Sequence, residues 1–147
     1  MVRIERATQL PAPPDEVFAA FHTRAGRLAL GRGYVEDVEI EGEGEGAVIR
    51  IYTHGHIGRG CVVERTELFD AKNREMRILM IDNGGFAPVA DYRARVRVFA
   101  AGEGASVVMV QTSFVPVDMD DTAALALIGQ NYDLLMKNLH ALFPLPA

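Results

Sequence analysis

Residues 34–116 contain six hydrophobic segments of strand length, separated by short breaks that are rich in glycine, asparagine and aspartate. Parallel strands need a crossover connection of about a dozen residues or more, and breaks this short favour antiparallel neighbours. The region therefore predicts an antiparallel meander. The strands that we expect are Tyr34–Ile40, Ala47–Thr53, Arg59–Phe69, Glu75–Ile81, Val89–Ala100 and Ser106–Val115.

The residues before this region predict one more strand and two short helices. Val2–Gln9 is typical of a strand, and the prolines of residues 11–14 end it, because proline lacks a backbone donor. The acidic pair Asp15 and Glu16 suits the start of a helix, where negative charge meets the positive end of the helix dipole. A second short helix is expected over Arg24–Leu30, followed by glycine.

After Pro116 the hydrophobic period changes from two to between three and four. This spacing predicts one long amphipathic helix, with aspartates at its start and Pro144 after its end. Such a helix must bury its apolar stripe against the sheet, and a strongly curved sheet would leave a cavity between them. The stripe consists of Leu125, Ile128, Tyr132, Leu135, Leu139 and Leu142.

Composition narrows the class of protein. The 147 residues are enough for one domain, which we expect to span residues 1–147, and the net charge of −5 argues against a nucleic-acid-binding surface. A single cysteine, Cys61, excludes an internal disulfide framework and suits a reducing cytoplasm. No apolar stretch is long enough for a signal peptide or a membrane span, so we expect a cytoplasmic protein without membrane insertion.

Five short stretches of the chain form an ordered series: residues 11–18, 44–50, 63–65 with 69–70, 88–94 and 114–116. They occur in the same order as in the helix-grip superfamily, which includes START-related domains, birch-pollen-allergen-like proteins and bacterial polyketide cyclase/dehydrase-like (SRPBCC) proteins. The chain resembles this superfamily over essentially its whole length. In many bacterial members a tryptophan stands where this chain has Val110, a smaller residue that would enlarge a pocket.

The resemblance implies an α+β helix-grip fold. In this fold a seven-stranded curved antiparallel sheet wraps around a long C-terminal helix, and two short helices follow the first strand. It also implies an internal cavity that binds a small hydrophobic molecule such as a lipid, a polyketide or an aromatic metabolite, with no cofactor, in a monomer or homodimer. Two alternatives stay open: a cofactor-independent cyclase or dehydratase that uses the same cavity, and a protein-interaction module with a structural cavity.

Arg50 and Glu64 are the charged residues that we expect at the site. If the hairpin between their strands is centred near Ile57, they lie directly opposite each other and share a mostly apolar face with Tyr52 and Val62. Two buried charges would then need each other. The alternatives are an ion pair with no further role, or a shifted register that places both residues in solvent.

Tyr92 is a third candidate for proton transfer beside Glu64 and Arg50, although a tyrosine on an apolar face more often serves packing. The other expected contacts are hydrophobic, because alternating strand residues and the stripe of the long helix must line the cavity. The complete predicted ligand-binding set is Arg50, Tyr52, Val62, Glu64, Met76, Ile78, Met80, Tyr92, Val96, Ile128, Tyr132 and Leu135.

His54 and His56 flank a glycine in the turn between the second and third of the six strands. Two histidines alone do not make a metal site, which needs three or four ligands, so we expect no metal and solvent-exposed imidazoles. By analogy with the resembled fold, this turn and the loop of residues 83–89 lie at the mouth of the pocket.

Overall fold

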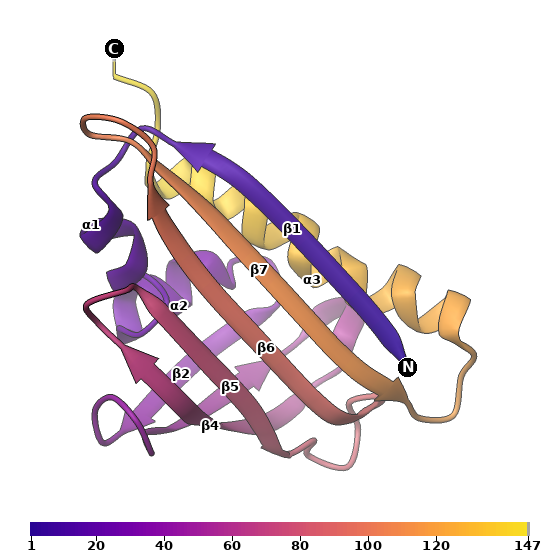
Figure 1. Ribbon diagram of the computed structural model, residues 1–147. Coiled ribbons are helices and arrows are strands. Elements are labelled where there is room, and N and C mark those ends of the chain that lie inside the picture. Colours follow the sequence, from indigo (N-terminus) through magenta and orange to yellow (C-terminus); the bar gives the residue numbers. More distant parts are fainter. Residues whose placement is uncertain (147) are drawn as a thin grey trace.

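The computed structural model describes residues 1–146. Seven strands form one sheet, and two short helices and one long helix lie on one side of it (Figure 1). The elements in chain order are β1 (Val2–Leu10), α1 (Pro14–Ala19), α2 (Arg24–Leu30), β2 (Val35–Glu41), β3 (Val48–Thr53), the 3₁₀ turn η1 (Gly55–Ile57), β4 (Gly60–Asp70), β5 (Glu75–Asp82), β6 (Val89–Ala100), β7 (Ser106–Pro116) and α3 (Asp121–Leu142).

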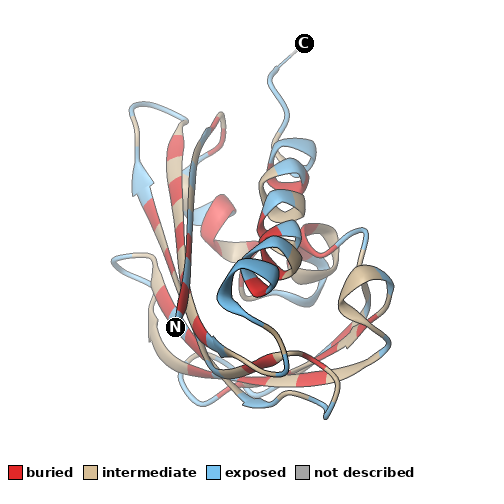
Figure 2. Cartoon of the chain, turned by 90° about the vertical axis from the view of Figure 1, so that its right-hand side faces the viewer, coloured by how far each residue is buried: buried red, intermediate tan, exposed pale blue. Residues whose placement is uncertain are grey.

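The sheet is an antiparallel meander from β2 to β7, and β1 adds to it beside β7. It curves strongly, and α3 runs along its concave side, as the end-on view in Figure 2 shows. The expected helix-grip architecture is therefore confirmed, and the predicted strands differ from the observed ones by at most one residue at either end.

The helix starts follow from local sequence. Proline occupies the first turn of α1, where its missing donor has no consequence. The hydroxyl of Thr23 accepts a hydrogen bond from the backbone of Gly26 at the start of α2, and the carboxylate of Asp120 accepts one from Ala123 at the start of α3. Each cap satisfies one backbone donor that the first helical turn leaves unpaired.

The core lies between the concave face of the sheet and the three helices. On β6 the residues Ala94, Val96 and Val98 are buried, while the intervening arginines lie on the convex face. The alternation that the sequence predicts for this strand is thus confirmed.

The apolar stripe of α3 was predicted only in part. Ile128, Tyr132 and Leu139 are buried as expected, but Leu125 and Leu142 are largely exposed. The helix turns the small residue Ala124 toward the sheet in place of Leu125, which lets the first turns approach β1 closely. No helix within residues 1–146 combines the length and the apolar character that crossing a membrane requires.

Candidate functional site

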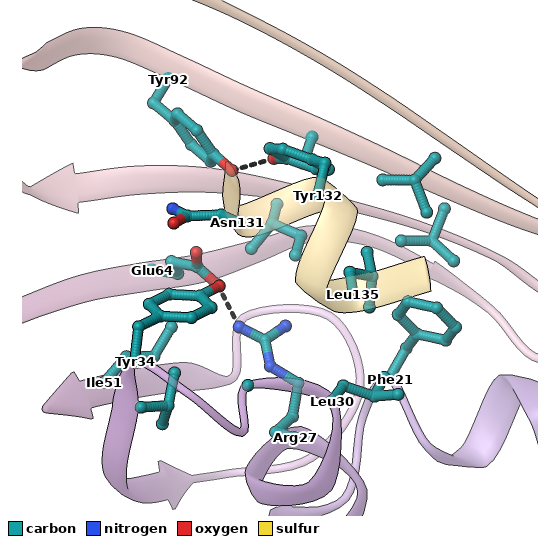
Figure 3. Close-up of a pocket in the computed structure, with 16 residues that line it drawn as sticks. Phe21, Arg27, Leu30, Tyr34, Ile51, Glu64, Tyr92, Asn131, Tyr132 and Leu135 are labelled. Atoms are coloured by element: carbon teal, nitrogen blue, oxygen red, sulfur yellow. Dashed lines mark hydrogen bonds and ion pairs between the residues drawn. The ribbon is translucent and has the colours of Figure 1, made fainter. Parts of the chain in front are cut away.

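A pocket of about 110 Å³ lies between the concave face of the sheet, α2 and the middle of α3 (Figure 3). We call it the inner pocket. Most of its wall is apolar, and its polar side chains gather in two groups that are described below. Its lining residues are Phe21, Arg27, Leu30, Gly31, Tyr34, Val35, Ile51, Glu64, Ile78, Tyr92, Ala94, Val96, Val110, Asn131, Tyr132 and Leu135.

The first polar group is a buried ion pair between α2 and β4. Arg27 Nη2 donates to Glu64 Oε1 at 2.7 Å, and the two side chains are only 14% and 8% exposed. Burial disfavours the charge on the guanidinium, but the neighbouring carboxylate outweighs this effect, so the pKa of Arg27 is raised above its ordinary value. Arg27 therefore keeps its positive charge beside the carboxylate of Glu64.

The second polar group is a chain of three hydroxyls on β6, β7 and α3. Thr112 Oγ1 donates to the Tyr132 hydroxyl at 2.5 Å, and the hydroxyls of Tyr132 and Tyr92 are hydrogen-bonded to each other. Three hydroxyl protons are present, but only two are needed for these two hydrogen bonds. One phenolic proton of the tyrosine pair is therefore left to donate elsewhere, and both tyrosines line the inner pocket.

Burial keeps these tyrosines protonated. Removal from water raises the pKa of Tyr132 to about 12 and raises the pKa of Tyr92 and of Tyr34 well above 10. At neutral pH each hydroxyl is thus a hydrogen-bond donor or a weak acid, and none can serve as a base.

The η1 turn packs against two residues that line the inner pocket, Asn131 and Tyr34. His56 Nε2 is hydrogen-bonded to Asn131 Oδ1 of α3 at 2.5 Å, and the imidazole packs against the ring of Tyr34 with 5.5 Å between centroids. The expected exposed histidine is therefore wrong for His56, because this turn bends onto the helix. Among residues 1–146 no group of three potential metal ligands is present.

The predicted pairing of Arg50 with Glu64 is wrong. The hairpin pairs Ile49 with Glu64 and Arg50 with Val63, one residue away from the expected register. Because successive strand residues point to opposite faces, this shift moves Arg50 and Tyr52 to the convex side. There Arg50 forms an ion pair with Glu41, and neither Arg50 nor Tyr52 lines the inner pocket.

Six of the predicted residues do come together around the inner pocket; they are Glu64, Ile78, Tyr92, Val96, Tyr132 and Leu135. Val62 and Ile128 are buried in the core beside it, and Met80 packs against the core from a half-buried position. Met76 lines a different cavity of the concave face. The binding role of each residue stays a prediction.

Sequence reasoning missed Arg27, Tyr34 and Asn131, although all three line the inner pocket. Each lies on an element whose orientation depends on tertiary packing: α2, the turn after it, and the polar edge of α3. One signal was available for Arg27. It stands within the short apolar helix of residues 24–30, where a charged side chain that faces the core needs a partner.

Residues 1–144 match the model of the family described as polyketide cyclase / dehydrase and lipid transport. The chain belongs to this family. The description joins two activities, and both concern hydrophobic molecules. No curated protein matches the chain.

Solved structures share the fold at low sequence identity. XoxI from Bacillus cereus is 21% identical with a TM-score of 0.79, covering 97% of this chain and 96% of its own. The Zhui aromatase/cyclase from Streptomyces sp. R1128 is 19% identical with a TM-score of 0.78, over 95% of this chain and 91% of its own. For Ara h 8.0201 the values are 18% and 0.75, over 96% of both chains. These likenesses establish the helix-grip fold.

Proposed function

We propose that the inner pocket binds a small, neutral, hydrophobic molecule that carries a carbonyl or another oxygen acceptor. The observation that carries this proposal is the surplus phenolic proton of the Tyr92–Tyr132 pair, which faces an otherwise mostly apolar wall. A few polar groups that fix orientation in an apolar concavity are typical of small-molecule sites. The family description, with its cyclases and lipid transport, agrees with a hydrophobic ligand.

Size and charge restrict the ligand. An engineered apolar cavity of about 150 Å³ in another protein holds benzene, so the inner pocket, at about 110 Å³, suits one ring. The Arg27–Glu64 pair is electrically neutral, and an ionised ligand would add an uncompensated charge to a buried site. A monocyclic ketone meets both conditions.

Cyclohexanone tests this proposal, with fluorobenzene as a probe of similar size that lacks a carbonyl. We expect cyclohexanone to bind the protein saturably in a ligand-observed NMR titration and to bind more tightly than fluorobenzene. The double variant Tyr92→Phe/Tyr132→Phe should remove this preference, because it leaves no phenolic proton to donate while keeping both rings. Equal binding of the two probes by the unmodified protein would contradict the proposal.

A second candidate function is acid–base catalysis at a ketone. Glu64 is the one carboxylate among the described residues that line the inner pocket, and it shares the pocket with protonated tyrosines. A phenol that donates to a carbonyl and a carboxylate that removes a neighbouring C–H proton would together form an enol. This is the kind of step that a cyclase or dehydratase of the same family would use.

Deuterium exchange at the carbons next to the cyclohexanone carbonyl distinguishes an enzyme from a carrier. If the protein catalyses enol formation, it accelerates this exchange in D2O. Glu64→Gln then abolishes the acceleration while cyclohexanone still binds. Binding without accelerated exchange supports the carrier function.

A further inference from the structure

A second and larger cavity lies on the same concave face. Its volume is about 580 Å³, and it is bounded by the α1–α2 connection, the β2–β3 hairpin, β4 and β5. We call it the outer cavity. Its lining residues are Phe21, His22, Thr23, Arg27, Ile40, Gly42, Glu43, Gly44, Ala47, Ile49, Thr66, Phe69 and Met76.

Two side chains separate the outer cavity from the inner pocket. Phe21 and Arg27 line both spaces, and Arg27 reaches from α2 to Glu64 on β4 through the buried ion pair (Figure 3). Joining the two spaces would require Arg27 to leave Glu64 and would expose a buried charge without its partner, which is strongly unfavourable. The two spaces are therefore separate sites in this structure.

The wall of the outer cavity suits an aromatic or alicyclic body. Its apolar residues include Ile40, Ile49 and Met76, and Phe69 presents its ring to the edge of His22 with 5.0 Å between centroids. Burial lowers the pKa of His22, which keeps this imidazole uncharged at neutral pH.

Hydrogen-bond donors without protein acceptors face this apolar wall. Thr66 is 3% exposed and lines the outer cavity, and its hydroxyl has no hydrogen-bond partner within residues 1–146. Arg27 uses Nη2 for Glu64, and in that described part of the chain its Nε and Nη1 donate to no acceptor. A ligand oxygen at this position would accept a hydrogen bond from Thr66 or Arg27, which would stabilise the bound state.

The charges around the outer cavity indicate whether the ligand oxygen belongs to a carboxylate or to a neutral group. The charge of Arg27 is already balanced by Glu64, and the exposed carboxylate of Glu43 stands on the wall of the same cavity. An anion here would face two carboxylates and one cation. A neutral carbonyl accepts from Thr66 or Arg27 without that repulsion.

We propose that the outer cavity is a second binding site, distinct from the inner pocket, for a neutral bicyclic or larger hydrophobic molecule with a carbonyl oxygen that Thr66 and Arg27 recognise. The inference does not depend on the function proposed for the inner pocket.

The test uses 2-acetonaphthone, a neutral bicyclic ketone, and 2-naphthoate, its carboxylate counterpart. We expect 2-acetonaphthone to bind with one equivalent per chain and more tightly than 2-naphthoate. Intermolecular NOEs should connect it to the methyl groups of Ile49 and Met76 and not to those of Val110. NOEs to Val110, or tighter binding of 2-naphthoate, would overturn the proposal.

Thr66→Val tests the recognition of the carbonyl, because it replaces a hydroxyl by a methyl group of similar size. Loss of one hydrogen bond of about 1 kcal/mol weakens the binding of 2-acetonaphthone by about fivefold. Thr8→Val is the matched control. Thr8 lies beside α3, where its hydroxyl is hydrogen-bonded to His140, and it lines neither cavity, so this variant should leave the affinity unchanged. Equal affinities of the two variants would overturn the role of Thr66, and the NOE pattern gives an answer even if Thr66→Val fails to fold.

Saturation with cyclohexanone tests whether the sites are separate. If they are, the affinity for 2-acetonaphthone stays the same when cyclohexanone saturates the protein. Mutual displacement would show one shared cavity and would overturn the second site while leaving the inner pocket as a ligand site.

Discussion

At the scale of single residues, the ion pair of Arg27 with Glu64 is the contact whose loss should cost the most. Glu64→Ala leaves the Arg27 guanidinium, 14% exposed, without its partner. We expect this variant to lower the free energy of unfolding by about 3 kcal/mol, as measured by urea denaturation. Arg50→Ala is the control, because Arg50 pairs with the exposed Glu41 on the convex face and should change stability by less than about 0.5 kcal/mol. A larger loss at Arg50 than at Glu64 would contradict this assignment.

The raised pKa values of the tyrosines allow a prediction of how the free energy of unfolding changes at alkaline pH. The chain has four tyrosines, and the pKa of every one is raised: by burial for Tyr34, Tyr92 and Tyr132, and mainly by a hydrogen bond to the Glu39 carboxylate for Tyr52. In the unfolded chain they ionise near pH 10. Above that pH, ionisation of the tyrosines lowers the free energy of the unfolded state but not that of the folded state. The free energy of unfolding therefore falls as the pH rises from about 10 to about 12.

Ultraviolet absorbance of tyrosinate measures this effect. In the folded protein little tyrosinate should form at pH 10, and its appearance at higher pH should coincide with the loss of the circular dichroism signal. One full equivalent of tyrosinate in the folded protein at pH 10 would contradict the assignment for at least one side chain.

At the scale of elements, the 3₁₀ turn between β3 and β4 explains why the site was only partly predicted. The strands themselves follow from alternation and glycine-rich breaks, and their ends agree with the structure. The register does not follow from these signals, because it depends on how many residues the turn takes up. Thr53 pairs with Gly60, so the connection holds one residue fewer than a hairpin centred on Ile57 would have. That single residue exchanges the faces of Arg50 and Ile49.

The contact of this turn with α3 predicts the rate of ligand exchange. His56→Ala removes the hydrogen bond to Asn131 and the packing against Tyr34, which together hold the turn on the helix. We expect faster dissociation of cyclohexanone, seen in NMR line shapes, and faster hydrogen exchange at residues 55–58. His54→Ala is the matched control in the same segment, because the side chain of His54 makes no hydrogen bond within residues 1–146. Identical exchange rates for the two variants would contradict a closing role for His56.

At the scale of the whole molecule, the sequence predicts a hollow between a curved sheet and a terminal helix. It does not predict that this hollow is divided into the inner pocket and the outer cavity. The division depends on Arg27 and Phe21, which come from the region of α1 and α2 and reach across to the sheet. Their side chains point into the hollow only because α1 packs at one particular angle against β6 and β7, and α2 against β2 and α3. No periodicity in the sequence specifies that angle.

Substitution of Val110 tests whether the inner pocket has enough empty space for a ligand of one ring. Val110 is buried on β7 and lines the inner pocket, whereas Val108, two residues before it on the same face, is buried in the core and lines neither cavity. Val110→Phe places the added ring in empty space, so we expect a gain in stability of about 1 kcal/mol, a higher Tm and loss of cyclohexanone binding. Val108→Phe places the same ring where close-packed atoms already lie and should destabilise by about 1–3 kcal/mol. If the two variants lose stability equally, the space beside Val110 is not available to a ligand of one ring, and the inner pocket is not its binding site.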